Sequence, residues 1–216
     1  MRSHLAIRRG FCYTIPMYKR HLKRALDACL SFVALALILV PGALIALWIK
    51  LDSRGPVFFR QKRVGLGKKH FMILKFRTMR IDAPKDVPTH LLNDPYAFIT
   101  RSGRFLRKTS LDELPQLINI LKGEMSFVGP RPALWNQFDL IERRDECGAN
   151  TVRPGLTGLA QVSGRDELPI DVKAAYDGEY VRRLTFLMDV SCVLRTLRDA
   201  FRGAGVVEGG RTGEGN

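Results

Sequence analysis

An uncharged run from Ala28 to Ile49 is the feature that most constrains how this chain folds. A straight helix of about 22 residues, rising 1.5 Å per residue, is long enough to cross roughly 30 Å of hydrocarbon. A cleaved signal peptide fits poorly, because its apolar core is only about 7 to 15 residues long and a small-residue cleavage site follows it. Here Lys50, Leu51 and Asp52 follow instead. The run is therefore a membrane segment.

Two features of this segment argue against a simple crossing. Pro41-Gly42 lies past the middle of the run, where proline removes a helix hydrogen bond and favours a kink. Lys and Arg are abundant on both sides of the run, and cytoplasmic loops collect these residues. Because both flanks are basic, we expect both ends to stay inside, which makes residues 18–51 a re-entrant helix-break-helix hairpin. A kinked helix that spans the membrane is the alternative.

The composition bounds the class of protein. A length of 216 residues suits one domain plus an anchor. The net charge of +14 implies a negatively charged partner, which is anionic lipid, nucleotide phosphate or nucleic acid. The four cysteines are far apart and form no C-x-x-C pair, so neither a zinc finger nor a disulfide framework is indicated. A reducing cytoplasmic setting follows more easily.

The chain after the membrane segment has mixed helix and strand patterns. Short β-prone runs at residues 57–59 and 71–76 flank a Gly-containing turn and predict a small β-hairpin. Apolar residues at helical spacing predict a helix from Leu111 to Leu121, ended by Gly123. Ser110 with Glu113 fits a capping box, although Pro115 would move the regular start to about position 115. We therefore expect residues 52–202 to form a compact, mostly helical α+β cytosolic domain.

The two termini and the last helix complete this organisation. We expect a basic extension at residues 1–17 and a flexible Gly-rich tail at residues 203–216. Before the tail, apolar residues share one helical face while arginines lie elsewhere around it, which is typical of an interfacial amphipathic helix. Packing in the core explains this apolar stripe almost as well. The residues of the stripe are Val190, Val193, Leu194, Leu197 and Phe201.

Two short motifs carry candidate chemistry. Asp112 and Glu113 are adjacent carboxylates directly after a basic stretch that includes Arg107. Such a pair suits a divalent metal and a phosphorylated substrate, although adjacent acids near arginines more often form a surface salt-bridge cluster. In the Val-Gly-Pro-Arg-Pro loop at residues 128–132, two prolines restrict the backbone around Arg131 and reduce the entropy lost in holding its side chain. An ordinary turn is the alternative for this loop.

Four motifs occur in order along the chain: Lys75–Met79, Leu106–Gln116, Gly129–Pro132 and Arg153–Arg165. Together they closely resemble the bacterial sugar transferases known as monotopic phosphoglycosyl transferases, over about residues 18–201. The resemblance implies an enzyme that transfers a sugar 1-phosphate from a UDP-sugar to undecaprenyl phosphate and releases UMP. It places this reaction at the cytoplasmic face of the bacterial inner membrane, where it initiates surface glycan assembly. It also implies a re-entrant membrane helix, and the short extension before that helix looks like the minimal catalytic form.

The resemblance also implies roles for the carboxylate pair. Asp112 becomes the nucleophile that forms a covalent aspartyl-phosphosugar intermediate, Glu113 its neighbouring carboxylate, and Mg²⁺ the metal that both bind. An ionised aspartate attacks phosphorus without first losing a proton. Mg²⁺ prefers one or two carboxylates together with phosphate oxygens and water. Glu113 either orients the metal or accepts a proton from the lipid phosphate, and the sequence leaves both roles open.

The substrate-binding candidates are basic. Arg107 and Arg131 match arginines of the family motifs, and arginine grips phosphate in a bidentate way that lysine does not. Lys75, Arg77 and Arg165 are weaker candidates, for which a structural or lipid-facing role is the alternative.

The expected partners are a UDP-sugar, undecaprenyl phosphate and anionic lipids of the inner membrane. The charge of +14 leaves a membrane-tethered nucleic-acid-binding module or a lipid scaffold as alternatives. The chain has no recognisable reader motif and none of the basic–aromatic interleaving that stacks bases, so we expect no nucleic acid. The sequence indicates neither the sugar nor the oligomeric state.

Overall fold

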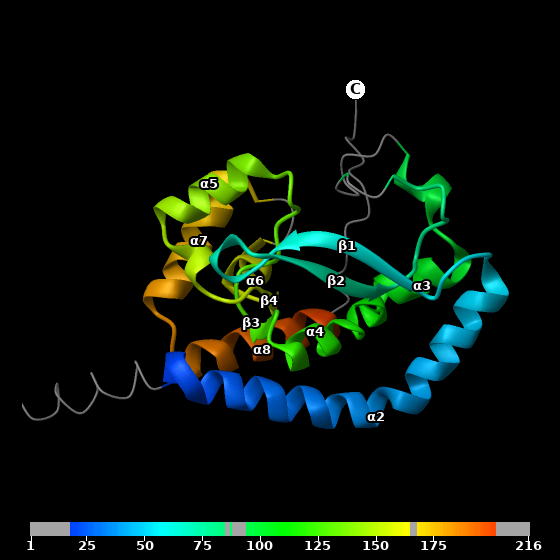
Figure 1. Cartoon of the computed structure of the whole chain (residues 1–216), viewed down its shortest axis with the longest axis horizontal. Helices are drawn as coiled ribbons and strands as arrows, with labels where there is room; N and C mark the ends of the chain where they lie inside the picture. Colours follow the sequence, from blue (N-terminus) through cyan, green and yellow to red (C-terminus); the bar gives the residue numbers. More distant parts are fainter. Residues whose placement is uncertain (1–17, 85–86, 88–93, 165–167, 202–216) are drawn as a thin grey trace, which may run out of the picture.

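A computed structural model describes residues 18–84, 87, 94–164 and 168–201 (Figure 1). The protein is mostly helical, with one long apolar helix near the N-terminus and two small sheets. The extension at residues 1–17, the tail at residues 203–216 and Arg165 lie outside the described residues. Figure 1 shows α2 along one side of the molecule, with the other elements gathered above it.

The elements follow one another along the chain in mixed order. The strands are β1 (Phe58–Val64), β2 (His70–Phe76), β3 (Ser126–Val128) and β4 (Gly155–Thr157). The α-helices are α2 (Lys23–Asp52), α3 (Arg101–Lys108), α4 (Gln116–Lys122), α5 (Phe138–Glu146), α6 (Leu159–Gly164), α7 (Ile170–Arg182) and α8 (Phe186–Phe201). Short helical turns are η1 (Tyr18–Leu22), η2 (Leu66–Lys68), η4 (Pro95–Phe98), η5 (Leu111–Glu113) and η6 (Ala149–Thr151).

The apolar run predicted to enter the membrane lies in one helix of 30 residues, α2, with Pro41 inside it. Figure 1 shows that α2 bends in its C-terminal part instead of breaking into two helices. Proline is a known cause of such a bend, because it removes one main-chain hydrogen bond. Among the described residues, α2 is the one helix long and apolar enough to cross a membrane. Its middle is exposed, for example at Leu37, Leu39 and Val40.

One face of α2 packs on the folded domain. Ala34, Leu35 and Ile38 contact an apolar cluster that includes Leu117 and Ile120 of α4. Near the start of α2, Arg24 donates hydrogen bonds to the carbonyl oxygens of Ile120 at 2.6 Å and Leu121 at 2.7 Å. These contacts satisfy carbonyls at the C-terminal end of α4, where a positive charge is favourable. The apolar helix is thus a fixed part of the fold.

The predicted hairpin is confirmed. β1 and β2 pair in antiparallel register, with Phe58 opposite Phe76 and Val64 opposite His70. Phe71 and Ile73 of β2 face the same apolar cluster as α4 and α2. The hairpin therefore fixes where the residues at the end of β2 lie.

The helix predicted from Leu111 to Leu121 is divided in two. Its first turn is the 3₁₀ helix η5, and α4 begins only at Gln116, after Pro115. The capping box is wrong, because Ser110 makes no side-chain cap hydrogen bond. Ser110 adopts a left-handed conformation with φ of 57°, whereas a capping residue is typically extended. Gly123 ends α4 in the left-handed region, as predicted.

The second sheet brings two distant motifs together. β3 and β4 are parallel, with Ser126 opposite Gly155 and Val128 opposite Thr157. A Cβ atom on Gly155 would lie 2.1 Å from the amide nitrogen of Gly129. Only glycine permits this approach of two main chains. The loop that carries Arg131 therefore lies directly against the Arg153–Arg165 motif.

The stripe on α8 lies mainly at the surface. Leu194 is 60 % exposed and Leu197 is 50 % exposed, while Asp189 and Cys192 of the same helix are buried. Core packing therefore does not explain the exposed part of the stripe.

A buried polar cluster joins α8 to the start of the apolar helix α2. Asp189 accepts hydrogen bonds from the hydroxyl of Tyr18 at 2.6 Å and the ammonium group of Lys23 at 2.5 Å through Oδ2. Its Oδ1 lies 2.8 Å from the hydroxyl of Tyr180, whose single hydrogen is shared between this oxygen and the carbonyl oxygen of Val128 at 2.9 Å. One carboxylate therefore connects η1, α2, α7 and α8.

We expect Asp189→Ala to lower the melting temperature of the detergent-solubilised protein by on the order of 10 °C, because removing one partner of a buried ion pair costs about 3 to 5 kcal/mol. Asp171→Ala is the matched control, since Asp171 forms an exposed ion pair with Arg143 and such pairs contribute little. Equal melting temperatures for the two variants would show that the buried cluster is not needed for stability.

Candidate active site

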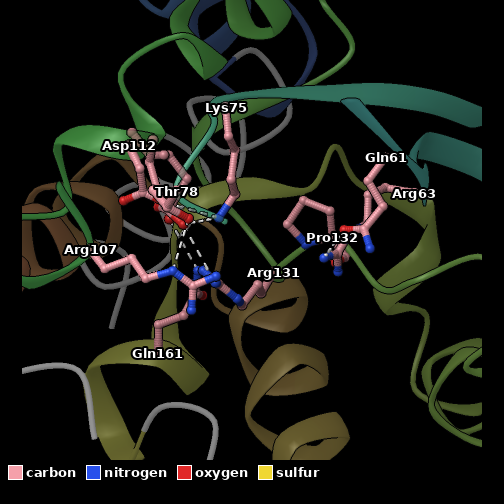
Figure 2. Close-up of polar contacts among 11 residues, drawn as sticks. Gln61, Arg63, Lys75, Thr78, Arg107, Asp112, Arg131, Pro132 and Gln161 are labelled. Carbon is pink, nitrogen blue, oxygen red and sulfur yellow. Dashed lines mark hydrogen bonds and ion pairs between the residues drawn. The ribbon is translucent and has the colours of Figure 1, made fainter. Parts of the chain in front are cut away.

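Two cations and two carboxylates meet where β2, η5 and the loop after β3 come together (Figure 2). The ammonium nitrogen of Lys75 lies 2.6 Å from Glu113 Oε1 and 4.0 Å from Asp112 Oδ2. Arg131 Nη2 lies 3.5 Å from the same Glu113 oxygen. The structure thus brings together four residues that the sequence singled out, from three separate motifs.

The position of the carboxylates follows from the turn that precedes them. The left-handed backbone at Ser110 separates α3 from η5. Leu111 and Leu114 on either side of the acidic pair pack against a cluster that includes Ile49 of α2 and Phe76 of β2. Because these leucines are held in the apolar cluster, Asp112 and Glu113 are directed toward the cations. The site is therefore attached to the C-terminal part of the apolar helix α2.

The two carboxylates have different electrostatic environments. Burial raises the pKa of Asp112 above its ordinary value; Lys75 opposes this effect, and the charge of Glu113 adds to it. Burial acts on Glu113 in the same direction, but Lys75 and Arg131 outweigh it and bring the pKa of Glu113 to about 2. Glu113 is therefore the stably charged partner of the cations. Asp112 is a desolvated carboxylate whose Oδ2 lies 4.0 Å from the Lys75 ammonium nitrogen.

Arg107 reaches the site from α3. Its Nε donates a 2.9 Å hydrogen bond to Thr78 Oγ1, just past the end of β2. The same stretch of chain fixes α3, because a Cβ atom on Gly103 would lie 2.0 Å from the carbonyl oxygen of Thr78. No pattern in the sequence singles out Thr78, although it lies inside the Lys75–Met79 motif. Figure 2 shows Arg107 and Thr78 next to the carboxylates.

Arg77 makes its hydrogen bonds elsewhere. Its guanidinium group donates to the carbonyl oxygen of Arg54 at 2.5 Å and to that of Ser53 at 2.8 Å. These carbonyls follow the C-terminal end of α2, and Arg77 is only 5 % exposed. The structure places Arg77 outside the carboxylate cluster. Its contacts are those of a structural residue, which was the alternative to substrate binding.

Gln161 of α6 has an unusual environment for an amide. Its nitrogen donates to the carbonyl oxygen of Leu156 at 3.2 Å, whereas its Oε1 is buried without a hydrogen-bond partner in the part of the chain that the structure describes. Buried polar atoms are nearly always satisfied by protein or water. This oxygen is therefore a place for a donor from a ligand or an ordered water.

The residues present fit Mg²⁺ only if the substrate completes its coordination. Within the described ranges, no group of three or more His, Cys, Asp or Glu side chains is placed to hold a metal ion. Asp112 and Glu113 supply the one or two carboxylates that Mg²⁺ accepts when phosphate oxygens and water provide its other ligands. Binding at Glu113 Oε1 would compete with Lys75, which lies 2.6 Å away.

Comparisons with known proteins show which family the chain belongs to. Residues 18–203 match the family described as "Bacterial sugar transferase". The chain is 38 % identical to an undecaprenyl-phosphate galactose phosphotransferase of Salmonella typhimurium, over 85 % of this chain and 41 % of that protein. It is 34 % identical to the exopolysaccharide production protein ExoY of Sinorhizobium fredii, over 81 % of this chain and 83 % of ExoY.

A third relative is a UDP-glucose:undecaprenyl-phosphate glucose-1-phosphate transferase of Caulobacter vibrioides, which is 44 % identical over 81 % of this chain and 68 % of that protein. The chain spans less than half the length of the Salmonella relative but most of ExoY. The matched region includes all four motifs and every element around the carboxylate pair. The chain therefore belongs to the bacterial sugar transferase family.

Proposed function

We propose that this protein transfers a sugar 1-phosphate from a UDP-sugar to undecaprenyl phosphate, releases UMP and thereby initiates assembly of a bacterial surface glycan. Its relatives are named for the transfer of galactose or glucose phosphate to this lipid. The observation that carries the proposal is the Asp112–Glu113 pair, whose side chains are only 12 % and 20 % exposed, with Lys75, Arg107 and Arg131 around it. Phosphoryl transfer depends chiefly on such charge neutralisation and positioning.

Asp112 is the nucleophile in this proposal. Its carboxylate oxygen attacks the phosphorus that bears the sugar, while the bond from that phosphorus to the bridging oxygen breaks and UMP leaves. An oxygen of the lipid phosphate then attacks the same phosphorus and releases Asp112 as a carboxylate. Asp112 suits this role better than Glu113, because Glu113 is held in a 2.6 Å contact with Lys75 and desolvation makes a carboxylate more reactive.

The remaining groups hold the diphosphate. Arg131 and Arg107 bind phosphate oxygens through their planar guanidinium groups, and Lys75 orients Glu113 and balances its charge. Mg²⁺, held by Asp112 and Glu113, would neutralise negative charge on the diphosphate. Glu113 is therefore either a metal ligand or the group that takes a proton from the lipid phosphate.

The two attached ends of α2 support a re-entrant, monotopic arrangement at the cytoplasmic face of the inner membrane. Near its start, Lys23 binds Asp189 of α8, and at its end, Asp52 accepts hydrogen bonds from the amide and hydroxyl of Ser102 at 2.9 and 2.8 Å. Because both ends contact one folded domain, they belong on the same side of a bilayer about 30 Å thick. The exposed stripe on α8 then lies as an amphipathic helix among anionic lipids of the interface.

Cysteine labelling tests this topology. We expect Lys19→Cys and Arg60→Cys, in a background without the four native cysteines, to react only with reagents that reach the cytoplasm. Both positions are exposed and lie on opposite sides of the apolar run. Modification of either one by an impermeant reagent in intact spheroplasts would contradict the re-entrant arrangement, while permeabilised cells provide the positive control.

The chemical step is tested without lipid acceptor. We expect the wild-type protein, mixed with Mg²⁺ and a UDP-sugar, to release about one UMP per active site and to gain the mass of one sugar phosphate on Asp112. UDP-glucose and UDP-galactose are the first substrates to try. Asp112→Asn should abolish both the burst and the adduct, because the amide does not attack phosphorus.

A protein that is fully active with undecaprenyl phosphate but shows neither burst nor adduct without it would favour direct attack by the lipid phosphate. In that case Asp112 would only hold the metal. Intact-protein mass spectrometry separates the two mechanisms.

Replacing either site arginine by lysine tests phosphate recognition. We expect Arg107→Lys and Arg131→Lys to lower kcat/KM for the UDP-sugar by about tenfold or more, because the charge remains while the planar fork is lost. Unchanged melting temperatures would show that the variants are folded. Full activity in both variants would exclude these arginines as phosphate ligands.

A further inference from the structure

The loop that carries Arg131 is held through its carbonyl oxygens. Prolines precede and follow Arg131, and proline has no amide hydrogen to donate. The first carbonyl of the loop, that of Pro130, accepts a 2.8 Å hydrogen bond from the amide of Gly155, and the last, that of Ala133, accepts one of 2.9 Å from the amide of Val64. Main-chain contacts thus fix the loop at its two ends.

An arginine side chain holds the carbonyl of Arg131 itself. Arg144 of α5 donates through Nη1 to this oxygen at 2.9 Å. Its Nε and Nη2 both donate to Asp177 Oδ2 of α7, at 2.8 and 2.6 Å. The side chains of Arg144 and Asp177 are 4 % and 1 % exposed. One guanidinium group therefore connects a buried carboxylate to the backbone of the proposed phosphate ligand.

A second arginine, from a different element, holds the next carbonyl. Arg63 of β1 donates through Nη1 to the carbonyl oxygen of Pro132 at 2.9 Å. The amide oxygen of Gln61 accepts hydrogen bonds from Nε and Nη2 of Arg63, at 3.0 and 2.6 Å. Figure 2 shows Gln61, Arg63 and Pro132 together, with Arg131 between them and the carboxylates.

Stability alone does not account for this arrangement. A buried ion pair such as Arg144–Asp177 contributes little net stability, because desolvation of both charges offsets their attraction, and well-packed apolar residues often serve as well. Replacing Arg144 and Asp177 by apolar residues would leave the carbonyl of Arg131 without the donor that lies 2.9 Å from it. The geometry points instead to a role in holding the loop.

We propose that Arg144 and Arg63 are positioning residues for Arg131. They bind the carbonyls of Arg131 and Pro132 from two different elements, so that the Arg131 side chain meets the diphosphate from a backbone that is already ordered. Ordering a site in advance lowers the entropic cost of binding, and small displacements of a supporting group cost activity. This inference rests on the proposed function, in which Arg131 binds the diphosphate.

A double-mutant cycle with UDP and Mg²⁺ as the probe tests the inference independently of the sugar. The single variants are Arg131→Met, Arg144→Lys and Arg63→Met. The two double variants combine Arg131→Met with Arg144→Lys or with Arg63→Met. Arg144→Lys keeps a charge for Asp177, and Arg63→Met removes the donors to Gln61 and to the carbonyl of Pro132, so the second variant gives the same readout if the first folds poorly. Arg143→Lys is the control, because the exposed Arg143 pairs with Asp171 and Glu146.

We expect Arg131→Met to raise the Kd for UDP by about tenfold or more, as for loss of a hydrogen bond to a charged group. Arg144→Lys and Arg63→Met should each raise it by a smaller factor, and neither should raise it further once Arg131 is replaced. Arg143→Lys should bind UDP like the wild type.

Three results would overturn the inference. If Arg144→Lys and Arg63→Met leave the Kd unchanged, the two arginines do not position Arg131. If they weaken UDP binding by the same factor with and without Arg131, they act through the fold in general, and the proposed function stands. If Arg131→Met itself binds UDP like the wild type, Arg131 is not a diphosphate ligand, and its part in the proposed function fails as well.

Discussion

The attachment of both ends of α2 to one folded domain is the constraint on which the rest of the structure depends. At the start of the helix, Asp189 accepts hydrogen bonds from Tyr18 and Lys23, and at its end, Asp52 accepts them from Ser102 at the first turn of α3. The exposed apolar middle of α2 is therefore held next to the elements that carry the site. A lipid substrate whose phosphate lies at the membrane surface and a water-soluble UDP-sugar are able to meet only at such a boundary. The fold thus supports the proposed reaction before any catalytic group is considered.

The chemistry depends on two adjacent carboxylates that the fold makes unequal. Two titratable groups with environments that push their pKa values apart commonly divide the work of a site between them. Here Lys75 and Arg131 lower the pKa of Glu113, whereas burial raises that of Asp112. The difference originates in the short η5 turn, where successive side chains meet different neighbours. Proximity in sequence therefore does not imply equivalence, and the roles proposed for the nucleophile and its charged neighbour follow from these contacts.

The sequence predicted the parts of the site that depend on local pattern and motif. The hairpin and the end of α4 at Gly123 agree with it. The structure also brings together the candidates Lys75, Asp112, Glu113 and Arg131. Arg77 was a weaker candidate with a structural role as its alternative, and the structure places it beyond the end of β2, where it binds carbonyl oxygens that follow α2. The conformation of Ser110 was missed because only Gly, and less often Asn or Asp, signals a left-handed turn. Arg144 was missed because it lies in a run of charged residues that resembles a solvated helix face, and its partner Asp177 is distant in the chain.

The Arg131 loop shows why such distant partners are needed. Prolines on both sides of a residue limit its backbone freedom, but they also remove two amide donors from the segment. The loop is left with carbonyl acceptors that other elements must satisfy. β1 supplies two donors, and β4 and α5 supply one each. Two of the four donors are arginine side chains, which reach further than a backbone amide and connect the loop to residues outside the β3–β4 sheet. Rigidity at Arg131 is therefore a property of the whole domain, so helices that contact neither carboxylate still determine where the phosphate ligand lies.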